Sequence, residues 1–151
     1  MRKADIVLAS PATGSLSLTA LLYRVALRSR YVHSMLYIGD GRIIHTSARN
    51  GVVVGPLPRK IYKKDRYGVF RIRELTKIQQ DKVVDEALQW KHKKLDHAGV
   101  ITNVPARLLG FKKALISWER NRIWCSKLIY KSFYAAGIEL VPPEKAEVIA
   151  S

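Results

Sequence analysis

The chain has 151 residues, of which 48% are hydrophobic, so its composition excludes a disordered polymer and favours one globular domain spanning residues 1–151. Its 27 Lys plus Arg against 12 Asp plus Glu give a formal net charge of +15, which favours an anionic polymer or a membrane surface as partner, although solubility accounts for it equally well. The single cysteine, Cys125, excludes an internal disulfide framework.

The N-terminus, MRKADIVLAS, lacks the pattern of an export signal because Asp5 interrupts the apolar run almost at once. The apolar segment Leu16–Leu27 contains Arg24 and is far shorter than the ~20 residues of a membrane span. We therefore expect a soluble, cytoplasmic protein without a signal peptide, and delivery by a non-classical route is the alternative.

The first elements in chain order are a short buried strand over Ala4–Ala9 and a turn at SPATGS. A helix capped by Ser15 or Ser17 is expected to run from this turn to about Arg28.

A β-hairpin follows, with strands over Val32–Ile38 and Arg42–Thr46 joined by a Gly-Asp-Gly turn. Alternation puts His33, Met35 and Tyr37 on one face of the first strand. If the strands pair symmetrically about the turn, Met35 lies opposite His45, so the two histidines share a face as diagonal neighbours. A slip of one residue would separate them, and the sequence alone leaves the register open.

The remaining elements are given by turn and capping signals further along the chain. Thr76 and Gln79 form a capping box at the start of a helix, and Gly137 is a C′ glycine at the end of another. We expect strands over Val52–Val54 and Tyr67–Ile72, helices over Lys77–Lys91 and about Ala106–Ser117, and a last helix from Cys125 or Ser126 to Gly137. The apolar core positions expected in the Lys77–Lys91 helix are Ile78, Val83, Ala87, Leu88 and Trp90.

The chemistry centres on Cys125, which follows a short apolar lead-in and begins a helix. A helix N-terminus favours the thiolate over the thiol, because unpaired N–H groups and the positive end of the helix dipole face the sulfur. A thiolate nucleophile needs an imidazole partner, and either His33 or His45 can supply it. A third polar group is then needed to orient that imidazole.

Structural roles account for the same residues singly. A lone cysteine is more often a small buried hydrophobe than a nucleophile, and a strand histidine is more often structural. His92 and His97 lie in a charged stretch and are interpreted as solvated or substrate-side. No spacing typical of a metal site, no phosphate-binding loop and no nucleic-acid motif is present, so we expect no metal and no cofactor.

The order of the pieces resembles the circularly permuted NlpC-type, papain-like superfamily of cysteine peptidases and amidases, in which a histidine-bearing sheet precedes a cysteine-bearing helix. The matching segments are ADIVLAS as the opening strand, YVHSMLYIGDGRIIHTSARNGVVV as the histidine segment, YGVFRI as the next strand and WCSKLIYKSFYAAGI as the nucleophile helix.

The sequence is similar to two branches of that superfamily. Bacterial and viral members are mostly peptidases or amidases, and many have Glu as the third polar residue and CSEL at the nucleophile. This chain instead has Lys127 within Cys125–Leu128, and His45 stands in the third position, twelve residues after His33. In that respect it is similar to the lecithin:retinol acyltransferase-like branch, which pairs two histidines with the cysteine.

The resemblance implies an α+β, permuted papain-like fold, with an antiparallel sheet packed against helices and the nucleophile at a helix N-terminus. It implies Cys125 as nucleophile, His33 as general base and acid, and His45 as orienting group. Tyr37 and Trp124 are candidate cleft residues by their place in the sequence, and core packing is the alternative for both.

The function that follows is a cysteine hydrolase cleaving an amide or peptide bond through an acyl-enzyme, with cell-wall peptide as one candidate substrate. The alternatives are a lipid or thioester acyltransferase of the same fold and a non-enzymatic polyanion-binding module. The substrate, the acceptor and the oligomeric state are left open by the sequence.

Overall fold

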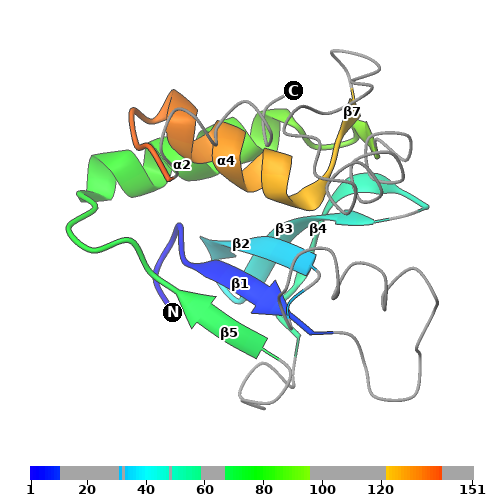
Figure 1. Cartoon of the computed structure of the whole chain (residues 1–151), viewed down its shortest axis with the longest axis horizontal. Helices are drawn as coiled ribbons and strands as arrows, with labels where there is room; N and C mark the ends of the chain where they lie inside the picture. Colours follow the sequence, from blue (N-terminus) through cyan, green and yellow to red (C-terminus); the bar gives the residue numbers. More distant parts are fainter. Residues whose placement is uncertain (11–30, 32, 48, 59–66, 96–121, 141–151) are drawn as a thin grey trace, which may run out of the picture.

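A β-meander forms the centre of the fold in the computed structural model (Figure 1). The structure describes residues 1–10, 31, 33–47, 49–58, 67–95 and 122–140. Strands β2 (His33–Gly39), β3 (Arg42–Ser47) and β4 (Gly51–Pro56) follow one another and pair antiparallel. The expected helix from Ser15 or Ser17 to about Arg28, the expected helix over residues 106–117 and His97 lie outside the described residues.

Two further strands complete the sheet. Strand β1 (Ile6–Ala9) pairs antiparallel with β2, and β5 (Tyr67–Phe70) pairs antiparallel with β1. The result is a five-stranded antiparallel sheet in the order β4-β3-β2-β1-β5, which confirms the predicted α+β class. A separate parallel pair joins β6 (Lys94–Leu95) to β7 (Arg122–Ile123).

The turn between β2 and β3 follows from its sequence. Asp40 and Gly41 have φ of 49° and 68°, and two successive positive φ angles define the type I′ turn that suits a tight hairpin. The predicted pairing of Met35 with His45 is confirmed. Close to the turn the register shifts by one residue, so that Gly39 pairs with Arg42.

Helix α2 (Lys77–Gln89) begins as predicted with a capping box. The N–H of Gln79 donates to Thr76 Oγ1 at 3.2 Å, and the N–H of Thr76 donates to Gln79 Oε1 at 3.0 Å. Its buried face consists of Val83, Val84 and Ala87. The expected core position of Ile78 is wrong, because that side chain is 81% exposed in the first turn of the helix.

Helix α4 (Cys125–Ala135) ends at the predicted glycine. Gly137 has φ of 77°, its N–H donates to Tyr134 O, and the N–H of Ile138 donates to Phe133 O. These two bonds are those of a Schellman motif, which satisfies carbonyls that the helix end leaves unpaired. The start of the helix at Cys125 agrees with the sequence prediction as well.

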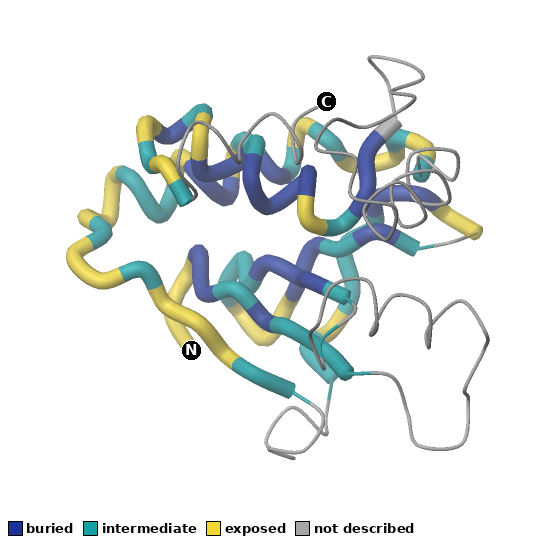
Figure 2. The backbone as a smooth tube through the Cα atoms, viewed as in Figure 1, coloured by how far each residue is buried: buried dark blue, intermediate teal, exposed yellow. Residues whose placement is uncertain are grey.

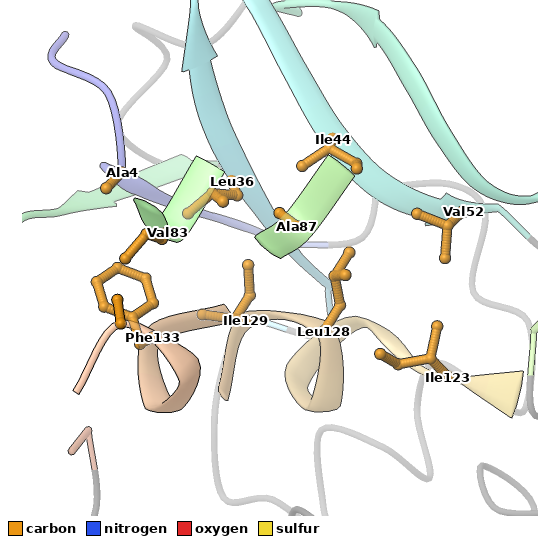
Figure 3. Close-up of a cluster of buried hydrophobic side chains, with 11 residues drawn as sticks. Ala4, Leu36, Ile44, Val52, Val83, Ala87, Ile123, Leu128, Ile129 and Phe133 are labelled. Atoms are coloured by element: carbon orange, nitrogen blue, oxygen red, sulfur yellow. The ribbon is translucent and has the colours of Figure 1, made fainter. Parts of the chain in front are cut away.

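Both helices pack on one face of the sheet, and the buried segments are those at which the two layers meet (Figures 1 and 2). The core between the layers joins Leu36 and Ile44 of the sheet to Val83 of α2 and to Leu128 and Phe133 of α4 (Figure 3). The opposite face of the sheet has its own smaller cluster, built on Val7, Met35 and Ile43. Strand alternation thus sorts β2 as the sequence predicts, with Leu36 toward the helices and Met35 away from them.

Candidate active site

Two imidazoles meet on neighbouring strands of the meander. His33 Nε2 lies 3.3 Å from His45 Nδ1, and the two rings stand edge to face with centroids 5.4 Å apart. The contact follows from the register, since Met35 is opposite His45 and His33 is two residues before Met35 on the same face. The structure therefore brings these two predicted site residues together.

The same nitrogen of His45 has a second neighbour, because Nδ1 also lies 3.2 Å from the carbonyl oxygen of Thr46. A carbonyl only accepts, so a proton on Nδ1 of His45 would be shared between Thr46 O and His33 Nε2. Without that proton, Nδ1 accepts from the Nε2–H of His33. In either tautomer the Nε2 atom of His33 is directed at His45, which leaves its Nδ1 as the nitrogen available to another partner.

Burial lowers the pKa of both histidines. Loss of hydration alone lowers the pKa of His33. For His45, loss of hydration comes first and the neighbouring charge of His33 adds to it, and both lower the pKa against a smaller opposing effect of Thr46 O. Both rings are therefore neutral near pH 7, which is the state in which an imidazole can accept a proton.

Cys125 is the first residue of α4, and its side chain is half-buried. The preceding cap residue, Trp124, contributes no side-chain hydrogen bond, and the first turn contains no acidic residue. The N–H groups of Cys125 and Ser126 belong to those that an α-helix leaves without an intrahelical acceptor. The sulfur thus lies at the positive end of a helix whose dipole no side chain of that turn neutralises.

Helix α4 lies along β2 and runs in the same direction. Near its start, Ile123 lies beside Val52, which pairs with Thr46 at the end of β3 (Figure 3). Towards its end, Phe133 lies on the Ala4 side of the same cluster, with Val83 between them, and the N–H of Ala4 donates to Tyr37 O near the end of β2 (Figure 3). Cys125 therefore lies over the end of the sheet at which β2 begins with His33 and β3 ends after His45.

The described residues include no hydrogen bond between Cys125 Sγ and either imidazole. The rings share the sheet face of Met35, whereas α4 packs on the face of Leu36, so the imidazoles point to the side of the sheet opposite to α4. In ligand-free enzymes, catalytic hydrogen bonds are often long and shorten only when substrate binds. The structure brings the imidazoles together and leaves the thiol at the same end of the sheet as a separate group.

The two predicted cleft residues have identifiable packing roles. Tyr37 OH accepts a hydrogen bond from the N–H of Gly41 at 3.0 Å and so stabilises the hairpin turn. Trp124 is 8% exposed, and the Nζ atom of Lys127 lies 4.9 Å from its ring centroid.

His92 is exposed, and the described ranges contain no group of three or more side chains suited to holding a metal ion.

Two residues of interest were not predicted as site residues. Lys127 is 5% exposed in the first turn of α4, where it adds positive charge near Cys125. Ser34, between His33 and Met35, is buried, and its Oγ has no hydrogen-bond partner. The sequence signal for Lys127 was its departure from CSEL, whereas the signal for Ser34 was only its place on the helix-facing side of the strand.

A search with models of protein families finds no match to this chain, and a search of curated proteins finds no significant match. The interpretation of the site therefore rests on its own geometry. Within the part of the chain that the structure describes, no helix has the length and apolar character needed to cross a bilayer.

Proposed function

We propose that this chain is a cysteine hydrolase of permuted papain-like fold, which cleaves an amide or peptide bond through an acyl-enzyme on Cys125. The observation that carries the proposal is the contact between His33 Nε2 and His45 Nδ1. An imidazole held at one ring nitrogen by a polar neighbour, with its other nitrogen available, is the arrangement that a general base of a triad requires.

The groups are then assigned by what each can do. His33 accepts the Cys125 proton at Nδ1, because its Nε2 is directed at His45. His45 orients that ring and stabilises the imidazolium that forms. The backbone N–H groups of Cys125 and Ser126 stabilise the negative charge on the oxygen of the attacked carbonyl.

The reaction proceeds in two halves. Sγ forms a bond to the carbonyl carbon as His33 takes the thiol proton, and the C–N bond breaks as the leaving amine receives that proton. Water then adds to the acyl carbon and gives a proton to His33, and the C–S bond breaks as this proton returns to the sulfur.

The test is to trap the acyl-enzyme. The full chain is incubated with p-nitrophenyl acetate or with a cell-wall stem peptide, and the protein mass and released product are followed. We expect one acyl group on Cys125, no acylation in Cys125→Ala, and normal acylation in Ser126→Ala, since Ser126 is the exposed neighbour on the same turn. Acylation of Cys125→Ala at the rate of the native chain would refute the proposal.

A further inference from the structure

One buried hydroxyl stands out in the interface between the sheet and α4. Ser34 is 8% exposed, and in the described ranges its Oγ is the buried side-chain polar atom without a hydrogen-bond partner. Leaving such a group unsatisfied costs about 1–3 kcal/mol. Ser132, a second buried serine, shows the usual solution, because its hydroxyl donates to Leu128 O at 2.7 Å.

The place of Ser34 in the sheet directs its side chain at the start of α4. It lies on the face of β2 that also bears Leu36, and this is the face on which α4 packs. It is two residues before Leu36, towards the end of the sheet where Ile123 lies beside Val52. Because α4 runs in the same direction as β2, the first turn of the helix lies over this end, and Cys125 opens that turn.

We propose that Ser34 is a positioning residue whose hydroxyl donates a hydrogen bond to the Cys125 sulfur when the thiol is deprotonated. The inference rests on the proposed function, since it needs Cys125 to act as a thiolate. It adds a side-chain donor to the backbone donors of the helix start.

In the resting structure Ser34 Oγ has no partner, so a bond to Cys125 Sγ requires a change of side-chain rotamer when the thiolate forms. A neutral thiol is a weak acceptor, so it offers little to a nearby hydroxyl, whereas a thiolate is a charged acceptor whose hydrogen bonds are stronger. A serine hydroxyl can turn about its C–O bond toward a charge that forms beside it. A buried donor on the strand beneath the helix start would need only this local rotation to meet the charge, and donors held close to a developing charge stabilise it in an active site.

Other titratable or charged groups at this end of the sheet would act on the same sulfur through space. His33 and His45 lie on the opposite face of β2 and β3, Lys127 lies on the first turn of α4, and Lys94 on β6 is exposed. A measurement on Ser34 must therefore be compared with variants of those groups.

The experiment is the pH dependence of Cys125 alkylation by iodoacetamide in the full chain. Ser34→Ala is expected to move the alkylation midpoint up by about one pH unit, so that alkylation below the midpoint slows about tenfold. Ser34→Thr keeps the hydroxyl and is expected to keep the native midpoint. Ser132→Ala is the matched control, because it removes a buried hydroxyl of α4 that is already satisfied.

Stability distinguishes a positioning role from a structural one. Because Ser34 Oγ has no partner, Ser34→Ala should unfold in urea at the native midpoint or above it. Failure of Ser34→Ala to fold would overturn the inference, since the hydroxyl would then have a structural partner. An unchanged alkylation midpoint in Ser34→Ala, with a changed one in His33→Ala, would overturn the inference alone. Unchanged midpoints in both, at the ordinary thiol value of about 8.5, would overturn the proposed function as well.

Discussion

The role assigned to His45 can be tested by moving its polar atom. The orienting contact is made by Nδ1, which is bonded directly to Cγ of the ring. In His45→Asn the amide oxygen occupies an equivalent position one bond from Cγ and can accept from the Nε2–H of His33. In His45→Gln the amide lies one bond further out, near where Nε2 was, and His45→Ala has no polar atom.

The expected magnitude follows from the geometry of the contact. At 3.3 Å the bond is longer than the usual 2.9–3.0 Å, so between neutral rings it contributes at most about 1 kcal/mol. When His33 becomes an imidazolium the same bond is charge-assisted and contributes about 1.5–3 kcal/mol. Since ~1.4 kcal/mol is a factor of ten in rate, His45→Ala and His45→Gln should slow acylation about 10- to 150-fold. His45→Asn should stay within about tenfold of the native chain.

The assay is the burst of p-nitrophenol during single-turnover acylation, measured with circular dichroism and urea unfolding to establish that each variant is folded. Acylation rates that fall from the native chain to His45→Asn, and then to similar low values in His45→Gln and His45→Ala, would support orientation through Nδ1. Equal losses in Asn and Ala would refute it, because the polar atom at the Nδ1 position would then contribute nothing. Native rates in all three variants would remove His45 from the mechanism.

Two further predictions concern stability. Burial lowers the pKa of His33 and His45 in the folded chain below the unfolded value of about 6.5. In the pH range between the two values the unfolded chain binds more protons than the folded chain. The contribution of the two histidines to the free energy of unfolding is therefore fully present above about pH 6.5 and falls as the pH drops below it. The urea midpoint of the native chain should be lower at about pH 5.5 than at about pH 7.5. In the double variant His33→Gln, His45→Asn the difference between the two midpoints should be smaller. An equal difference in the double variant would assign the loss of stability to other groups. Gly51 and Gly41 both have a positive φ, of 66° and 68°, so a substitution by Ala costs about 1 kcal/mol at either position. Only at Gly51 would the new Cβ also lie 2.1 Å from Lys93 O. In urea unfolding, Gly51→Ala should therefore lower the free energy of unfolding by at least ~2 kcal/mol more than Gly41→Ala does. Equal losses of unfolding free energy in the two variants would contradict the close approach of the Gly51 and Lys93 backbones.

Local signals predicted the features that a few adjacent residues determine. The hairpin turn at Gly39-Asp40-Gly41, the capping box of Thr76 and the glycine after α4 each depend on backbone angles or hydrogen bonds within a few residues. The pairing at the turn, Gly39 with Arg42, does not by itself place Met35 opposite His45, because the register shifts between Tyr37 and Gly39. The sequence therefore predicted the meeting of His33 with His45 as the outcome of one register and did not select that register.

The rest of the candidate site depends on contacts between distant segments. The direction in which α4 lies on the sheet is determined by packing such as that of Ile123 beside Val52, and no pattern in either segment reports it. Ile78 fails for a related reason, since α2 buries the face of Val83 and Ala87 and its first turn lies outside the core. Ser34 is identified only by having no partner, which is a property of its surroundings and not of its sequence.

The state of the two histidines bears on how the thiol would be activated. Burial lowers the pKa of His33, so forming its imidazolium requires stabilisation that hydration does not supply. A resting thiolate–imidazolium pair is therefore disfavoured, and the absence of a hydrogen bond between Sγ and the rings in the described residues is consistent with a neutral resting site. In the proposed reaction, the proton would move to His33 only when His45 stabilises the ring and donors at the start of α4 stabilise the sulfur. This requirement links the tests of His45 and Ser34, because each removes stabilisation from one member of the same charge pair. If both roles are correct, the increase in the activation free energy of acylation in the double variant Ser34→Ala, His45→Ala will differ from the sum of the increases in the two single variants.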